Sequence, residues 1–215
     1  MPVAPGPQQY TTIAAAVDAE LEIKRSRFLC HLAPAGSEDE ARAVIAAVAQ
    51  AHPKARHHCT AFVLGPDAAT QRSNDDGEPS GTAGRPMLEV LLGEGLTDVV
   101  AVVTRYFGGV LLGAGGLVRA YGAAVSAAAA EARRVRYALR QEFTVELDYR
   151  WGPAFEAECH AAGWTVVETE YGERVTVRFA VPPEQEKRAR ERLADLSSGA
   201  ARPVAGETRY VRVTS

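Results

Sequence analysis

The sequence predicts an α+β protein, an α/β sandwich that is organised as two domains. Residues 138–215 read in the order strand, helix, strand, strand, helix, strand, which is typical of a ferredoxin-like domain. Residues 99–107 form a nearly continuous apolar run, as expected for a strand whose two faces are both covered. Because the pattern resets after Arg136, we place the domains at residues 1–137 and 138–215.

The N-terminal domain opens with a lead-in and a basic hairpin. Residues 1–9 contain three prolines and a glycine without any periodicity, and they predict a frayed segment. Residues 21–32 mix apolar side chains with charges. They predict an exposed strand or hairpin that carries Lys24, Arg25 and Arg27.

A helix follows, and the sequence marks its start. Ser37 with Glu40 three residues later forms a capping box, and apolar residues at helical spacing continue to about His52. The other elements of this domain are a strand, a long polar connection, a short helix, the apolar strand and an Ala-rich helix, predicted at 57–64, 65–84, 85–92, 99–107 and 117–134.

The C-terminal domain shows clear alternation in its strands. Its strands are predicted at 143–149, 164–170, 175–181 and 204–213, and its helices at 153–162 and 183–196. The second helix carries interleaved charges, with Glu186 and Arg190 at i,i+4 spacing. This spacing favours a solvated, ion-paired face over a nucleic-acid stripe.

Composition restricts the partners that the chain can attract. The net charge is −3 and the pI is near 6.0, so any nucleic-acid site must be a local basic patch. Cys30, Cys59 and Cys159 are widely spaced and predict buried, reduced thiols. The chain shows neither a secretory signal nor a run of about 18 apolar residues, so we expect a cytoplasmic protein without a membrane span.

The segment from Arg105 to Arg119 is the most informative candidate site. A strand feeds a double-glycine turn, and a second glycine cluster stands at the start of a helix. Outward-facing amides and the helix dipole predict a site for a phosphate or an RNA backbone. Turns needed for packing are an equal alternative, because the spacing fits neither a Walker loop nor a dinucleotide fingerprint. The candidate residues for nucleic acid or an anion are Lys24, Arg25, Arg27, His57, His58, Arg105, Tyr106, Gly108, Gly109, Gly113, Gly115, Gly116 and Arg119.

Three carboxylates lie close together in the polar connection, at Asp75, Asp76 and Glu78. Hard oxygen ligands at this density could hold magnesium. Asp-Gly and Glu-Pro are also ordinary turn formers. We favour a turn, since no second acidic motif completes a metal shell, and no other cofactor is predicted.

Imidazole and thiolate side chains gather at His57, His58 and Cys59, and both are common zinc ligands. Neighbours on a strand point to opposite faces, so His57 and His58 cannot readily share one ion. Structural or RNA-stacking histidines are therefore favoured. No nucleophile elbow is present, so no catalytic residue is identified and binding is favoured over catalysis.

Four motifs resemble the YigZ/IMPACT family. They are Lys24-Arg-Ser-Arg-Phe28, Ala55-Arg-His-His-Cys59, Asp75-Asp-Gly-Glu-Pro-Ser-Gly-Thr-Ala-Gly84 and the segment Arg105–Tyr121, of which the last two are highly specific. The resemblance covers most of residues 15–136, and the C-terminal part looks like the smaller domain of the bacterial members. It implies a βα fold shared with the second domain of the fifth small-subunit ribosomal protein and with domain IV of elongation factor G, followed by a domain like domain V of that factor.

Domains of this kind lie against RNA or the ribosome, so the resemblance implies a binding module with a role in translation regulation or the stress response. Recognition of a translation factor by the same surface is the first alternative. The second is an enzyme that acts on a phosphate-bearing small molecule, with Asp76 and Glu78 holding magnesium. The sequence does not indicate an oligomeric state.

Overall fold

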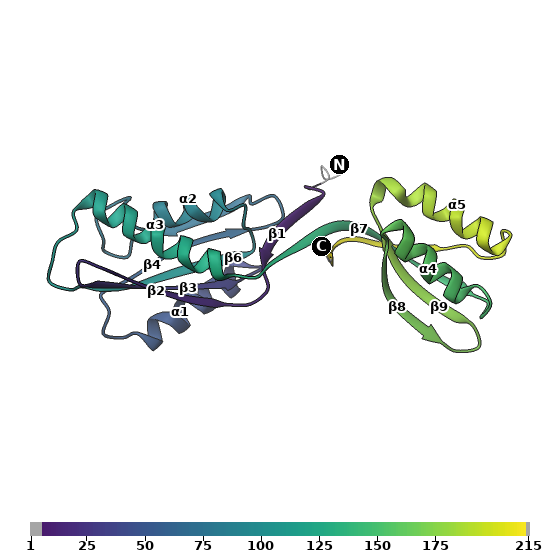
Figure 1. Ribbon diagram of the computed structural model, residues 1–215, viewed down its shortest axis with the longest axis horizontal. Coiled ribbons are helices and arrows are strands. Elements are labelled where there is room, and N and C mark those ends of the chain that lie inside the picture. The colour runs from purple at the N-terminus through teal and green to yellow at the C-terminus, as the bar shows by residue number, and fades with distance from the viewer. Residues whose placement is uncertain (1–5, 214–215) are drawn as a thin grey trace. The chain divides into compact units, whose positions relative to one another are not determined.

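The structure is a computed structural model that describes residues 6–213, so the first five residues of the predicted lead-in lie outside the described part. The chain forms two compact units that divide between Arg136 and Tyr137 (Figure 1). Each unit combines one sheet with helices, and the mixed α+β class is confirmed.

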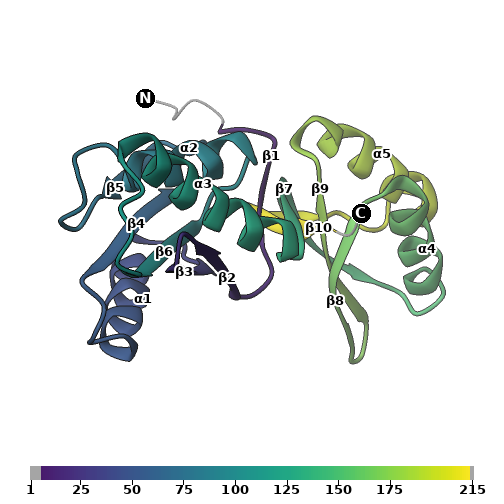
Figure 2. The same cartoon turned by 60° about the vertical axis from the view of Figure 1, so that its left-hand side comes forward.

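The first unit is a five-stranded antiparallel sheet with helices on both faces. Its strands are ordered β2-β3-β6-β4-β5, with α1 on one face and α2 and α3 on the other (Figure 2). The elements are β1 (Gln9–Ile13), β2 (Val17–Ile23), β3 (Ser26–Pro34), α1 (Glu38–Ala51), β4 (His57–Leu64), β5 (Thr70–Asn74), α2 (Gly84–Gly93), β6 (Val99–Tyr106) and α3 (Ala114–Glu131).

The core of this unit lies on both sides of β6. Alternate residues of β6 face opposite ways, so Val103 packs in the larger cluster under α2 and α3, whereas Val102 packs in the smaller one under α1. Every residue from Val99 to Arg105 is buried, which confirms that the apolar run is covered on both faces.

The start of α1 follows the capping pattern with one change. The Ser37 Oγ accepts the Glu40 N–H at 3.2 Å, as the capping box requires. The Glu40 carboxylate accepts the N–H of Gly36 at 2.7 Å, one residue before the cap. The helix ends at Ala51, close to the predicted His52.

Several boundaries differ from the prediction, and three of these differences have a clear physical reason. The connection 65–84 contains β5, whose sequence Thr-Gln-Arg-Ser-Asn gives no apolar alternation because this edge strand is largely exposed. The Ala-rich helix ends at Glu131 and not at residue 134, because Ala132 has extended backbone (φ −70°, ψ 126°). The next strand then begins at Arg134, well before the predicted residue 143.

The second unit is ferredoxin-like. Its elements are β7 (Arg134–Leu147), which begins in the last three residues of the first unit, α4 (Gly152–Ala162), β8 (Thr165–Tyr171), β9 (Val175–Val181), α5 (Glu186–Ser197) and β10 (Val204–Val213). Strand β7 pairs with β9 and β10, and β9 pairs with β8, so the spatial order is β10-β7-β9-β8. Phe155 of α4 and Leu193 of α5 pack with Phe179 of β9, so both helices cover the same face of the sheet.

Two further expectations can be compared with the structure. Cys30, Cys59 and Cys159 are free and buried, and burial raises the pKa of each thiol to about 12, so they are inert core residues. Among residues 6–213, no helix has both the length and the apolar character that crossing a membrane requires.

Candidate functional site

The predicted site residues come together at one end of the first unit. Strand β4 starts where β6 and β5 end, since His57 pairs with Arg105 and Thr60 with Asn74. The β2–β3 turn reaches the same place, because Arg27 pairs with Tyr106. We call this end the loop end, and it comprises the turn Lys24–Arg25, residues 52–57, loop 75–83 and loop 107–113.

Arg105 is a buried structural residue and not an exposed phosphate ligand. Its guanidinium pairs with the Glu78 carboxylate at 2.7 Å, and the two side chains are 7% and 4% exposed. The Tyr121 hydroxyl donates to the same Glu78 oxygen at 2.7 Å. The alternation of β6 turns Arg105 toward the face that α3 covers, where burial of a cation requires a counterion. The expectation that Arg105 contacts an anion at the surface is therefore corrected.

Asp75 forms the N-terminal cap of α2. Its carboxylate accepts the N–H groups of Ala83 at 3.0 Å, Gly84 at 2.8 Å and Gly81 at 2.7 Å, and α2 has no other side-chain cap. Burial alone would raise the pKa of Asp75, but the three amides outweigh it and lower the pKa below its usual range.

The other two carboxylates have partners of their own. Asp76 accepts the backbone N–H of His58 at 2.6 Å, and Glu78 is held by Arg105 and Tyr121. No group of three potential ligands exists among the described residues. The carboxylates of Asp75, Asp76 and Glu78 thus do not converge as a magnesium site would require, and the turn interpretation accounts for them.

Replacing Asp75 with asparagine should lower the free energy of unfolding by about 1–3 kcal/mol at pH 7, because an amide cannot accept all three bonds. The folded-state pKa of Asp75 is depressed, so its contribution is present above the unfolded pKa and disappears as pH falls through the folded pKa. Urea unfolding at pH 7 and pH 3 should show a difference that shrinks in acid. An equal difference at both pH values would contradict this role.

The histidines at this end have structural partners. His57 contacts the carbonyl of Asp76 at 2.8 Å, and His58 contacts the Thr104 hydroxyl at 3.1 Å on the opposite face of β4. This agrees with the argument against a shared ion. Burial lowers the pKa of His58, so this side chain adds little positive charge at neutral pH.

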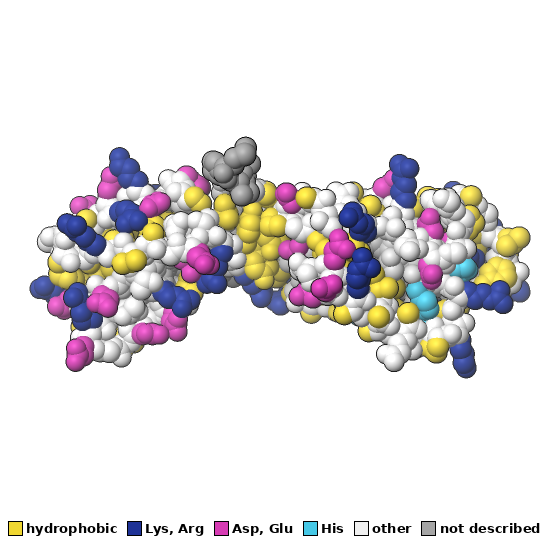
Figure 3. Space-filling model, turned by 180° about the vertical axis from the view of Figure 1, so that it is seen from behind, with side chains coloured by type: hydrophobic (Ala, Val, Ile, Leu, Met, Phe, Trp, Pro, Cys, Tyr) yellow, Lys and Arg dark blue, Asp and Glu magenta, His cyan; other side chains and the backbone are white. Residues whose placement is uncertain are grey.

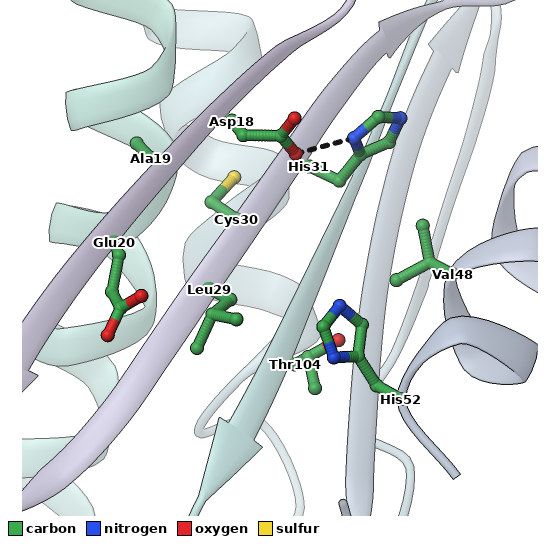
Figure 4. Close-up of a pocket in the computed structure, with 9 residues that line it drawn as sticks. All are labelled: Asp18, Ala19, Glu20, Leu29, Cys30, His31, Val48, His52 and Thr104. Carbon is green, nitrogen blue, oxygen red and sulfur yellow. Dashed lines mark hydrogen bonds and ion pairs between the residues drawn. The ribbon is translucent and has the colours of Figure 1, made fainter.

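A groove of about 350 Å³ lies beside α1 on the opposite sheet face from α3 (Figure 4). His31 and Asp18 form a pair at 2.7 Å in it, and His52 also lines it. This pair is not among the residues that the sequence predicts for a site, although the register of β2 with β3 places Asp18 opposite His31. The carboxylates of Asp18 and Glu20 in this lining disfavour a phosphate ligand.

Among the glycines of loop 107–113, one is needed for close packing and two are open to solvent. Gly108 lies directly against the carbonyl of Arg25, and its N–H donates to the Ser26 hydroxyl at 3.2 Å. This amide is therefore not free for an anion, contrary to expectation. Gly109 (φ +83°) and Gly113 (φ +74°) have no atom within 4 Å of the position a Cβ would take, so they remain open.

The N-terminus of α3 keeps the features of an anion site. The helix begins at Ala114, so Gly115 and Gly116 belong to its first turn, and no side chain caps it. An Arg119 guanidinium nitrogen lies 3.7 Å from the ideal Cβ position of Gly115. Of the two arginines that the sequence predicts as phosphate contacts, Arg119 is therefore exposed beside the helix N-terminus, whereas Arg105 is buried.

Several cations of the loop end are unpaired. Within residues 6–213 no ion pair or hydrogen bond engages the side chains of Lys24, Arg25, Lys54 and Arg56 at this end, or that of Arg119 near the start of α3. Lys54 and Arg56 were missed, although they stand in the connection to β4. Figure 3 shows basic and histidine side chains near one another on part of this unit.

Arg27 and Tyr106 are less available for contact with a nucleic acid than the sequence predicts, because both have side-chain partners. Arg27 pairs with Glu20 at 2.5 Å and lies over the Tyr106 ring at 5.8 Å, and the Tyr106 hydroxyl bonds to His52 at 3.0 Å. The pair with Glu20 is exposed, so it is weak and Arg27 can exchange partners.

The Lys24–Arg25 turn is conformationally strained. Both residues have positive φ, +49° and +66°, in a two-residue hairpin turn that normally carries Asn-Gly. A residue with a Cβ is less stable than glycine at positive φ, so Lys24 and Arg25 both raise the free energy of the turn. Backbone strain of this kind tends to occur at functional sites. The turn holds both cations at the tip of the hairpin.

Two family models match the chain. One, described as the Impact N-terminal domain, matches residues 24–129, and the other, described as a domain of unknown function (DUF1949), matches residues 145–200. The first match includes all four motifs in full, and the second lies within the ferredoxin-like unit.

Similar proteins cover nearly the whole chain. IMPACT family member YvyE from Bacillus subtilis is 40% identical over 202 residues, 94% of this chain and 93% of its own. IMPACT family member YigZ from Escherichia coli is 40% identical over 196 residues, 90% and 96% of the two chains. A solved structure, titled as the crystal structure of a hypothetical protein, matches with a TM-score of 0.63 at 38% identity, covering 94% of this chain and 98% of that one.

Proposed function

This chain belongs to the IMPACT family, and we propose that it is a binding module that attaches to RNA, in the setting of the ribosome, through the loop end of its first unit. The observation that carries the proposal is the set of unpaired cations on a strained turn beside an uncapped helix N-terminus. Phosphates are the ligands that such a combination of cations and amides favours.

The second unit is a poorer candidate for RNA. The face of its sheet opposite α4 and α5 carries Glu142, Glu146, Glu168 and Glu170. Arg178 on this face pairs with Glu168 at 3.0 Å, and Arg209 pairs with Glu142. A surface with this excess of carboxylates repels a polyanion, so we assign RNA contact to the first unit.

Binding is preferred to catalysis because the polar groups that an enzyme would use are engaged elsewhere. Asp75 caps α2, Glu78 neutralises Arg105, and the Cys59 thiol is buried with a raised pKa. Among the described residues, no hydrogen bond at the loop end joins a base to an exposed Ser, Thr or Cys side chain, since the Thr104 hydroxyl that His58 contacts is buried. An enzyme with magnesium on Asp76 and Glu78 has no geometric support.

Recognition of a translation factor is the second candidate, and one observation favours it. Loop 107–113 exposes Leu111 by 82% and Val110 by 38% at the same end. Exposed apolar side chains beside cations are also typical of protein interfaces. Affinity capture with and without nuclease separates the two, because partners bridged by RNA are lost on digestion.

Changing Lys24 and Arg25 together to glutamine should weaken binding to ribosomal particles about tenfold at low salt, because each lost phosphate contact reduces counterion release. The slope of log K against log salt should fall by about two, one for each contact. Sedimentation with ribosomal particles over a range of salt concentrations measures both quantities.

The matched control is Lys187→Gln with Arg188→Gln on α5, where both side chains are exposed and the charge change is the same. This variant should bind like the wild type. Unchanged sedimentation of the Lys24/Arg25 variant, or equal weakening in both variants, would overturn the proposed site.

A further inference from the structure

Phe107 is an exposed aromatic ring at the loop end. Strand β6 is buried until Arg105 and ends at Tyr106, and the next residue, Phe107, leaves 53% of its surface in solvent. In a chain with only 7% aromatic residues, a phenyl ring left in solvent beside free cations calls for an explanation.

The Arg105 guanidinium packs on one face of the Phe107 ring. The guanidinium of Arg105 lies 5.5 Å from the ring centroid, and Arg105 is itself fixed by its ion pair with Glu78. Because the guanidinium covers one face, the solvent-exposed part of the ring is its other face and edge. The ring is thus held in place and presents a flat apolar surface outward.

The hairpin turn that carries Lys24 and Arg25 lies against the residue that follows Phe107. Gly108 follows Phe107 in the chain and packs directly on the carbonyl of Arg25. Lys24 and Arg25 have no side-chain partner among residues 6–213. An aromatic platform next to unpaired cations is the arrangement by which proteins hold single-stranded nucleic acid.

We propose that Phe107 is a stacking platform for an unpaired base of single-stranded RNA whose phosphates contact Lys24 and Arg25. The inference rests on the proposed function and adds the state of the RNA. In a duplex the base faces are covered by neighbouring pairs, so the ring has nothing to stack on. The histidines, for which the sequence allowed stacking, and Tyr106, a candidate contact for nucleic acid, have hydrogen-bond partners of their own.

The test uses the full-length chain with single-stranded oligo(A) of about 12 nucleotides and with a duplex of equal length. Phe107→Ala and Phe107→Leu should both weaken oligo(A) binding about tenfold, because leucine is apolar but cannot stack. Phe107→Trp should bind at least as tightly as the wild type, and its fluorescence should be quenched. The wild-type signal from Trp151 and Trp164 supplies the background.

Three results would overturn the proposal. The first is full binding of oligo(A) by Phe107→Leu, which would indicate that the ring makes an apolar contact with a protein or a membrane. The others are equal affinity for duplex and oligo(A), and no quenching of the Phe107→Trp fluorescence. The Lys24→Gln/Arg25→Gln variant is assayed on the same oligonucleotide. If it loses binding while Phe107→Ala does not, RNA binding stands and stacking fails. If neither variant changes affinity, both proposals fail.

Discussion

Replacing Glu78 with glutamine is expected to lower the free energy of unfolding of the first unit by about 3–5 kcal/mol. The substitution keeps the size of the side chain but leaves the Arg105 guanidinium buried without a counterion. The position is sensitive for a second reason, since the Arg105 Nε is already buried without a hydrogen-bond partner in the described part of the chain. Loop 75–83 should also loosen, because Glu78 ties it to β6 and, through Tyr121, to α3.

The measurement must report on the first unit separately. Both tryptophans lie in the second unit, so tryptophan fluorescence follows that unit and serves as an internal control. Hydrogen exchange of the β6 amides reports on unfolding of the first unit. Glu89→Gln, an exposed partner of Arg85 on α2, should change stability by less than about 0.5 kcal/mol. A Glu78→Gln variant as stable as Glu89→Gln would show that the buried pair contributes little.

The pair can also be tested by removing both charges. Glu78→Leu with Arg105→Met replaces the buried ions by apolar side chains of similar length, and such replacements are often neutral or stabilising. We expect this double variant to recover most of the stability that Glu78→Gln loses. If it does not, the packing of loop 75–83, and not the unpaired charge, is the larger cost.

Local patterns in the sequence were enough to predict most of the fold. The capping box at Ser37 and the basic hairpin at residues 21–32 depend on neighbours within a few positions, and the structure contains both. The ferredoxin-like order was read from strand alternation in the same way. The polar strand β5 was missed because an exposed edge strand needs no apolar face to pair with β4.

The candidate site depended on contacts between distant segments, and these could not be read from local patterns. Arg105 looked like a surface cation because its counterion Glu78 lies 27 positions away, in a loop whose path the sequence does not reveal. Asp75 was missed as a helix cap for another reason, because its amide partners Gly81, Ala83 and Gly84 lie further along the chain than the three residues of a capping box. Phe107 was passed over because the sequence places it inside the covered apolar strand 99–107, whereas β6 ends one residue earlier, at Tyr106, and leaves the ring exposed.

Gly108→Ala should displace the Lys24–Arg25 turn and thereby weaken RNA binding about tenfold, as the loss of both cations would. A Cβ at this position would lie 1.9 Å from the carbonyl oxygen of Arg25 and 2.1 Å from its carbon. Both are backbone atoms, so no side chain can rotate away and the turn itself must move. We expect a loss of about 3 kcal/mol in the free energy of unfolding, at the upper end of the range for overpacked sites.

Two other glycines separate this clash from general effects of alanine. Gly109→Ala places a Cβ in open space but at φ +83°, so it should cost about 1–2 kcal/mol without moving the turn. Gly93→Ala is open and has no positive φ, so it should be neutral or slightly stabilising. If Gly108→Ala bound RNA as well as Gly109→Ala does, the contact between loop 107–113 and the β2–β3 turn would have no part in positioning Lys24 and Arg25. The strained turn would then owe its conformation to β2 and β3 alone.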